Sequence, residues 1–389
     1  MSVQSVQTLV STQSTQSTQS TQSTQSTQGR GVVTGDSNPL LSAALATSHD
    51  GVVATEALDF DDIGLRSDRL KQAEDRLTGL LGSDDAQLPR LPDTPYFLQA
   101  VVAGLIQSTR IELGEKQASL HARVISKGGP LSDSFAGDPF VKMTCPSIDD
   151  FAEQVPYIQS YADLRDERLP EIIVQMGDIL SFFAVGDLLD TERTPYTLKV
   201  LDAAAGYAGG IIQRIKLSFD GPRPVQFSPR VEPIIATPTH GTLPSGHATE
   251  AFLIASLLTL LRGGDPARAA ADMQQRFRLA ARIAVNRTVA GVHYPVDSAA
   301  GAVLGIGLAE HLAATAGAGA APAGNWAFDG TAWNNSDFHH GIVADLIDAA
   351  DTEGATSVVR SKDTSTRATD DLWSRLWKKA ASEHLPEGA

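Results

Sequence analysis

Residues 244–261 read PSGHATEAFLIASLLTLL, and this stretch predicts the start and the body of a buried helix. Ser245 is a good N-cap residue, apolar residues recur at helical spacing after it, and Gly263-Gly264 ends the pattern. A helix N-terminus offers unpaired backbone N–H groups and a positive dipole end, so it can bind an anion. Gly246 would let that anion approach the backbone, and His247 lies on the first turn. Read alone, the same letters also describe an ordinary helix start with a surface histidine.

Similar patterns predict helices through most of the chain after residue 95. The expected helices are Phe97–Gly114, Pro170–Leu189, Pro195–Lys216, Ser245–Arg262, Pro266–Ala290 and Pro295–Ala314. No run of alternating polar and apolar residues indicates a strand convincingly. The predicted fold class is therefore all-α, a helical bundle with a disordered N-terminal tail.

The chain divides by composition into three parts. Residues 1–90 are low in complexity, with six Ser-Thr-Gln repeats near the start, and such a polar tract cannot offset the entropy lost on ordering. We expect this part to be mostly disordered, with one helix around Leu65–Leu81. Residues 91–318 hold the helical domain, and residues 319–389 form a linker and a tail with short helices. The tail contains all four tryptophans. Its Leu372–Ala380 helix is expected to pack on itself, with docking on the core or on a second subunit as the alternative.

Two further blocks place cations and a histidine at helix junctions. In the first, Lys216 ends one helix and Arg223 lies between two prolines, which restrict the backbone around the guanidinium. A rigidly held guanidinium suits bidentate binding of phosphate oxygens. In the second, Arg287 precedes His293 at a helix break, and Asp297 can accept a hydrogen bond from one imidazole nitrogen, which leaves the other free to attack. A capping aspartate beside a packed histidine is the simpler alternative for this block alone.

Together the three blocks supply what a tetrahedral oxyanion needs: positive charge, a nucleophile on one side and a proton donor on the other. Their letters are Lys216-x6-Arg223-Pro224, Pro244-Ser245-Gly246-His247 and Arg287-x5-His293-x3-Asp297. This set resembles the signature of the type 2 phosphatidic acid phosphatase and vanadium-dependent haloperoxidase superfamily, and the chain looks like a soluble member. The resemblance spans approximately residues 150–315. Asn286 departs from it, because many phosphatase members have serine before the arginine.

The resemblance implies the helical bundle of this superfamily and a role for each residue. The residues that would bind the oxyanion are Lys216, Arg223, Ser245, Gly246 and Arg287. His293 would be the nucleophile that forms a phosphohistidine, and Asp297 would orient it. His247 would protonate the leaving group and then act as a base toward water. The implied function of residues 91–318 is hydrolysis of a phosphoric monoester, either a small phosphate ester or a lipid phosphate, without metal or other cofactor.

The same resemblance leaves a second function open, halide oxidation by a vanadate-dependent haloperoxidase. Vanadate has the shape and charge of phosphate, so the same residues could hold it as a cofactor, with His293 bonded to vanadium. His240 falls where haloperoxidases place an aromatic residue or a histidine near the halide site, and an ordinary loop residue is its alternative. We favour the phosphatase, because the segment between His247 and Arg287 is compact and the third block resembles phosphatase versions. A non-catalytic oxyanion-binding protein is the third option.

The composition excludes some classes of partner. A formal net charge of −15 should repel nucleic acid and anionic lipid. The longest apolar stretch, Ala251–Leu261, is too short to span a bilayer, and no secretory signal precedes Arg30. The single cysteine, Cys145, fits a reducing compartment. We expect a soluble protein, cytoplasmic rather than secreted, with no nucleic acid partner, no transmembrane segment and a homo-oligomer as an open option.

Overall fold

The computed structural model describes residues 95–124, 135, 137–318, 324–350, 357–362, 367 and 370–384. The predicted disorder of residues 1–90 and the predicted helix around Leu65–Leu81 lie outside these residues. From Leu98 onward the described residues belong to one compact unit. The division into domains at residues 91–318 and 319–389 stays a prediction.

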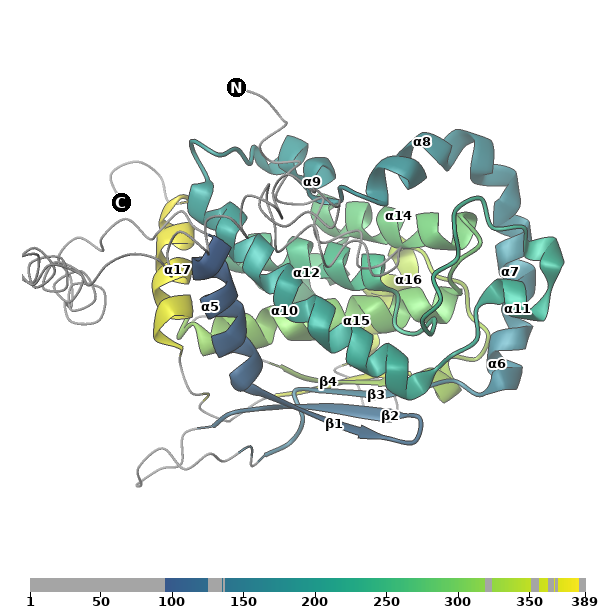
Figure 1. Cartoon of the computed structure of the whole chain (residues 1–389), viewed down its shortest axis with the longest axis horizontal. Helices are drawn as coiled ribbons and strands as arrows, with labels where there is room; N and C mark the ends of the chain where they lie inside the picture. Colours follow the sequence, from purple (N-terminus) through teal and green to yellow (C-terminus); the bar gives the residue numbers. More distant parts are fainter. Residues whose placement is uncertain are drawn as a thin grey trace, which may run out of the picture. The chain divides into compact units, whose positions relative to one another are not determined.

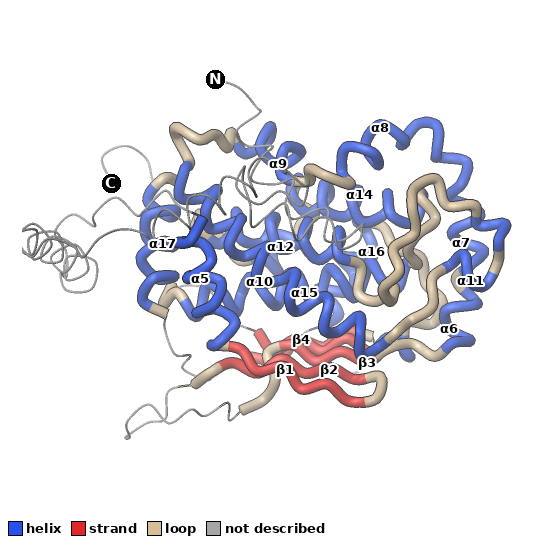
Figure 2. The backbone as a smooth tube through the Cα atoms, in the orientation of Figure 1, coloured by secondary structure: helices blue, strands red, loops and turns tan. Residues whose placement is uncertain are grey.

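Helices make up most of the described chain (Figures 1 and 2). In chain order they are α5 (Pro95–Gln107), α6 (Ile148–Glu153), α7 (Val155–Ser160), α8 (Arg165–Gln175), α9 (Leu180–Asp187), α10 (Pro195–Phe219), α11 (Pro224–Phe227), α12 (Gly246–Leu260), α13 (Pro266–Ala271), α14 (Gln275–Val289), α15 (Pro295–Thr315), α16 (His340–Ala350) and α17 (Asp371–Ser382). Three short 3₁₀ turns at Tyr161–Leu164, Pro229–Val231 and Gly330–Ala332 connect some of them. The predicted helices that begin at Pro195, at the Ser245 cap and at Pro295 are confirmed.

Three of the predicted helices are interrupted or too long. The helix predicted to end at Gly114 stops at Gln107, because the β-branched Thr109 and Ile111 continue in a strand. The predicted helix Pro170–Leu189 is two helices, α8 and α9, and α8 begins earlier, at Arg165, with Pro170 inside it. The carboxylate of Asp178 accepts from the Ser181 backbone N–H in the first turn of α9, at 2.9 Å. The predicted helix from Pro266 to Ala290 is likewise broken, between α13 and α14.

A five-stranded mixed sheet corrects the all-α prediction. Its strands are β1 (Thr109–Gly114), β2 (Gln117–Ala122), β3 (Val141–Thr144), β4 (Gly324–Asp329) and β5 (Val358–Lys362), in the spatial order β1-β2-β3-β4-β5. The β3–β4 pair is parallel and the other three pairs are antiparallel. Figure 2 shows the sheet along one side of the helices, with α15 packed against β3 and β4. The strands are only four to six residues long, and β3 and β4 come from distant parts of the chain. No local sequence pattern therefore predicts them.

Helices α12 and α15 form the centre of the core, and their close approach positions the site. All fifteen residues of α12 are buried. Gly301 of α15 lies against the start of α12: a Cβ at this position would come within 2.7 Å of the Ala248 Cβ and 2.8 Å of the Ser245 carbonyl oxygen. The absence of a side chain therefore allows backbone contact. At the same end, the Ser245 N–H donates to the Asp297 carbonyl at 2.9 Å, which ties the two helix N-termini together.

The C-terminal helix docks on the core, so the expectation that it packs on itself is wrong. Helix α17 lies beside α10. The indole N–H of Trp373 donates to the Leu312 carbonyl at 2.7 Å. The carboxylate of Glu383 accepts from the backbone N–H groups of Tyr196 and Thr197, each at 2.8 Å, and thereby caps the N-terminus of α10.

Among the described residues, no single helix has the length and apolar character needed to cross a membrane. One bent pair, Ile148–Gln175 with Leu180–Asp187, passes that test jointly by length and composition.

Candidate active site

The three sequence blocks meet where four helices end or begin. Lys216 lies in the last turn of α10 and Arg287 in the last turn of α14, while the Ser245-Gly246-His247 segment opens α12 and Asp297 lies in the first turn of α15. The buried members of this group are Lys216, Arg223, Ser245, Gly246, His247, Arg287, His293 and Asp297. His240 is half-buried, in the loop before α12. Helix ends therefore bring the predicted residues together.

The ring of His293 lies between the carboxylate of Asp297 and the guanidinium of Arg223. Its Nδ1 lies 2.8 Å from Asp297 Oδ2. Its Nε2 lies 3.2 Å from Arg223 Nη1. A guanidinium can only donate, so Nε2 accepts this hydrogen bond and Nδ1 carries the proton that is donated to Asp297. Nε2 thus carries the lone pair, as a nucleophilic imidazole requires, and this lone pair faces the Arg223 guanidinium.

Asp297 is itself held from two directions. Its Oδ2 accepts from the backbone N–H of Tyr294 at 3.0 Å and from the hydroxyl of Thr242. Burial raises the pKa of Asp297 to about 6, while the hydrogen bonds from Thr242 and Tyr294 oppose that rise. Thr242 was not predicted: it lies in a loop, and nothing in its neighbourhood in the sequence points to a carboxylate that far along the chain.

Arg223 is fixed by backbone carbonyls. Its Nη1 donates to Val292 O at 2.7 Å, its Nε to His240 O at 3.1 Å and its Nη2 to Gly241 O at 3.3 Å. The Nη2 atom also lies 3.1 Å from His240 Nδ1, which places His240 directly beside the guanidinium. The arginine between two prolines is therefore rigidly oriented, as its sequence context predicts.

Lys216 completes this side of the site from the end of α10. Its Nζ donates to the carbonyls of Gly241 and Thr242, at 3.1 Å and 2.8 Å. Those two residues belong to the loop that also contacts Arg223 and Asp297. The ammonium, the guanidinium and the carboxylate therefore share one short loop, and their mutual placement depends on it.

His247 and Arg287 lie next to the C-terminal end of α8. His247 Nε2 lies 3.0 Å from the Gln175 carbonyl, which can only accept, so this nitrogen carries a proton. Arg287 Nη1 lies 3.5 Å from the same nitrogen, and the shorter contact with the carbonyl decides the tautomer. Arg287 Nη2 donates to the side-chain oxygen of Gln175 at 3.0 Å and to Ile172 O at 3.4 Å. Gln175 was not predicted either, because it lies on a helix outside all three blocks.

At the start of α12, Ser245 acts as the predicted N-cap: its Oγ accepts from the Ala248 N–H at 3.4 Å. The capping contact leaves the hydroxyl proton available as a donor. Gly246 opens the helix and is buried.

Burial lowers the pKa of all three basic side chains of the site. It lowers the pKa of Arg287 to about 9 and that of Arg223 to about 10. It also lowers the pKa of Lys216 well below its ordinary value, and the charge of Arg223 lowers it further. The carboxylate of Asp297 interacts electrostatically with Lys216 and Arg223. A bound oxyanion with two negative charges would offset the excess positive charge.

The same burial keeps both histidines neutral at neutral pH. It lowers the pKa of His247 and of His293 well below the ordinary value. The charge of Arg287 adds to the effect on His247, and the charge of Arg223 adds to the effect on His293. A neutral His293 is the form that can attack an electrophile.

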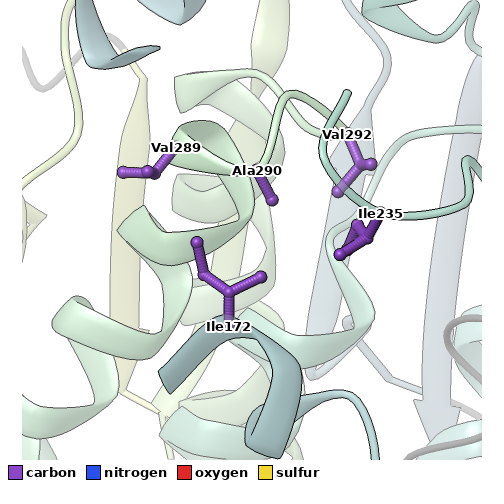
Figure 3. Packing of buried hydrophobic residues seen from close by; sticks show 5 residues of the cluster. All are labelled: Ile172, Ile235, Val289, Ala290 and Val292. Carbon is purple, nitrogen blue, oxygen red and sulfur yellow. The ribbon is translucent and has the colours of Figure 1, made fainter. Parts of the chain in front are cut away.

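An apolar cluster supports the loop that carries His293. It consists of Ile172, Ile235, Val289, Ala290 and Val292, from α8, the loop before α12 and the end of α14 (Figure 3). Between its last two members, Gly291 has a φ of 83°, which glycine adopts without strain. A Cβ there would also approach Pro233 Cα to 3.1 Å. The turn that separates Arg287 from His293 therefore depends on a glycine and on this packing.

Comparison with known families identifies the segment that carries the site. A model of the PAP2 superfamily matches residues 199–317, which contain every predicted site residue. The match confirms the resemblance to the type 2 phosphatidic acid phosphatase superfamily. None of the curated proteins matches the chain. Members of this superfamily are phosphatases or haloperoxidases, so the match supports phosphoester-hydrolase or haloperoxidase-type chemistry.

Proposed function

We propose that this chain hydrolyses phosphoric monoesters through a phosphohistidine on His293 Nε2, without a metal. One observation supports the proposal: in the line Arg223–His293–Asp297 the imidazole is neutral, is protonated on Nδ1 and directs its Nε2 lone pair toward the buried Arg223 guanidinium. That arrangement is the one in which a phosphoryl group held by the cations would meet a nucleophile.

In the first step the lone pair of His293 Nε2 attacks phosphorus, and the bond from phosphorus to the ester oxygen breaks. Asp297 stabilises the positive charge that develops on the ring, because it accepts from Nδ1. The leaving oxygen takes a proton from His247. Since His247 Nε2 keeps its proton on the Gln175 carbonyl, Nδ1 is the nitrogen that delivers it.

His247 must be protonated for this step, and substrate binding supplies the reason. The imidazole is neutral in the structure because burial and Arg287 lower its pKa. A phosphate dianion beside it favours the imidazolium and raises that pKa again. The proton donor is thus formed where and when the substrate binds.

In the second step water attacks the phosphohistidine. His247, now neutral, takes a proton from that water, and the bond between phosphorus and Nε2 breaks. Phosphate leaves, and His293 returns to its starting tautomer. Three cations, Lys216, Arg223 and Arg287, stabilise the phosphoryl oxygens in both steps, which is why the proposal needs no metal. Small phosphate esters and lipid phosphates both carry the required group.

The test is hydrolysis of an aryl phosphate after exhaustive chelation, with and without orthovanadate. We expect turnover without added metal and inhibition by vanadate. His293→Ala should abolish turnover, and His340→Ala, which alters an exposed histidine on α16, should not change it. Turnover by His293→Ala at the wild-type rate would rule out the proposal.

One observation favours a second candidate, a vanadate-dependent haloperoxidase: His240 Nδ1 lies 3.1 Å from Arg223 Nη2, at the edge of the oxyanion site. The chemistry of the donors fits vanadate, because Lys216, Arg223 and Arg287 could hold its oxygens and His293 Nε2 has a lone pair to offer. When bound, vanadate would supply the centre at which hydrogen peroxide oxidises halide. Under this candidate, vanadate activates instead of inhibiting, and bromide with peroxide brominates a phenol-type dye.

A further inference from the structure

Gln175 contacts both His247 and Arg287, although it lies outside the segment that matches the PAP2 superfamily. It is the last residue of α8 and is fully buried. Its backbone carbonyl lies 3.0 Å from His247 Nε2, and its side-chain Oε1 accepts from Arg287 Nη2 at 3.0 Å. One residue thus contacts both the proposed proton donor and an oxyanion-binding cation.

The orientation of the Gln175 amide follows from its neighbours. Arg168 Nη1 donates to Asn286 Oδ1 at 3.3 Å, so the amide nitrogen of Asn286 points the other way. That nitrogen donates to Glu171 Oε2 at 3.0 Å and to Gln175 Oε1 at 3.1 Å. Both partners of Gln175 Oε1, Asn286 and Arg287, are therefore donors. The atom between them must be the oxygen, and Nε2 is the other atom of the same amide.

This orientation leaves a buried donor unpaired. In the described part of the chain, Gln175 Nε2 has no hydrogen-bond partner. The Nε of Arg287 is buried and unpaired in the same sense. A buried donor without an acceptor lowers the stability of the folded protein. Two such donors on adjacent side chains therefore indicate that an acceptor binds there. An anion with several acceptor oxygens would meet both.

We propose that Gln175 is a further ligand of the oxyanion. Nε2 donates to an oxygen of the bound phosphoryl group, while Oε1 holds the Arg287 guanidinium against the same group. The inference rests on the proposed function, because it places that phosphoryl group in the site. It adds to the three sequence blocks a neutral donor from α8, and it makes Asn286 the residue that fixes the orientation of this donor.

The experiment is calorimetric titration of the full-length protein and its variants with orthovanadate. Gln175→Met keeps the size of the side chain and removes both amide atoms. Gln175→Glu keeps an acceptor for Arg287 and Asn286 and removes the donor. The control is Thr259→Val, which removes a buried hydroxyl whose hydrogen bond stays within α12, on Ala255 O at 2.8 Å. Thermal unfolding of each variant reports whether it folds.

We expect both Gln175 variants to bind vanadate about tenfold or more weakly than the wild type, as loss of a hydrogen bond to a charged group requires. Thr259→Val should bind as the wild type does. A crystal structure of the wild-type vanadate complex should place Nε2 within about 3.2 Å of a vanadate oxygen.

The outcomes separate this inference from the function on which it rests. If the wild type binds no vanadate, the proposed oxyanion site fails and the inference fails with it. If the wild type binds vanadate and a folded Gln175 variant binds it within twofold, only the inference is overturned. A vanadate complex in which Nε2 reaches no vanadate oxygen overturns it as well, even if Gln175→Met misfolds.

Discussion

Nδ1 of His293 lies 2.8 Å from Oδ2 of Asp297, four residues further along the chain. The carboxylate belongs to the first turn of α15, and the imidazole precedes that helix. The start of α15 therefore fixes the Asp297 carboxylate next to Nδ1 of His293. Only Nε2 of the ring is left to act as a nucleophile.

Replacement of Asp297 by asparagine should lower kcat by at least about 100-fold with little change in KM. The amide cannot stabilise the positive charge that develops on His293, while the cations that bind the substrate remain. Steady-state kinetics with an aryl phosphate measure both constants. Asp371→Asn, at an exposed carboxylate on α17, is the matched control. If the Asp297 variant changes KM alone, the carboxylate binds substrate and does not orient the nucleophile.

Replacement of Thr242 by valine should move the acidic limb of the pH–rate profile to higher pH. The Thr242 hydroxyl donates to Asp297 and holds its pKa down against burial. Without this hydrogen bond the pKa of Asp297 is higher. The reactive state, in which Asp297 is ionised, is therefore lost at a higher pH as the pH falls. Thr259→Val, which removes a buried hydroxyl that bonds within α12, is the control. An unshifted limb in the Thr242 variant contradicts the assignment.

Replacement of Gly301 by alanine should destabilise the protein by about 1–3 kcal/mol and reduce activity. The added methyl group meets the backbone of α12 at Ser245 and displaces the helix start from Asp297. Gly210→Ala on α10 is the control, because a Cβ there meets no atom within 4 Å. Urea unfolding and aryl phosphate kinetics report the two effects. Equal stability of the two variants would show that the contact between α12 and α15 tolerates a side chain.

Replacement of Glu250 by glutamine should stabilise the protein increasingly as the pH rises. Burial raises the pKa of the Glu250 carboxyl from 4.5 to about 8. Since the folded pKa exceeds the unfolded value, the wild type is most stable below the unfolded pKa and loses stability as the pH rises through the folded one. The difference between variant and wild type should grow between about pH 5 and pH 8, by up to about 1.4 kcal/mol per pH unit.

Urea unfolding at several pH values measures that growth, with Glu153→Gln at an exposed position as the control. A difference that stays constant with pH would mean that Glu250 is charged in the folded protein.

The helices and the site differ in how far the sequence predicts them. Helix α12 was predictable because its cap, Ser245, and its apolar run are neighbours in the chain. Lys216, Arg287 and His293 were placed at helix ends by prolines and glycines close to them. The sheet was not predictable from the sequence. Val141 pairs in register with Trp326 on the parallel strand β4, and no local pattern encodes that pairing.

The same physical reason explains the two site residues that sequence reasoning missed. Thr242 reaches Asp297, and Gln175 reaches Arg287, across long separations in the chain. A threonine in a loop and a glutamine at a helix end are ordinary residues until the fold gives them partners. Asn286 departs from the family signature, and its position in the sequence gives it no evident role. Its amide in fact orients Gln175.

The central claim is that a phosphoryl group is transferred to His293. Rapid quenching under alkaline conditions during turnover of a radiolabelled phosphate ester, followed by peptide mapping, tests it most directly. The account predicts that the label is found on the peptide that contains His293 and is absent from His293→Ala. A label on any other residue, or unlabelled protein throughout steady turnover, would contradict it.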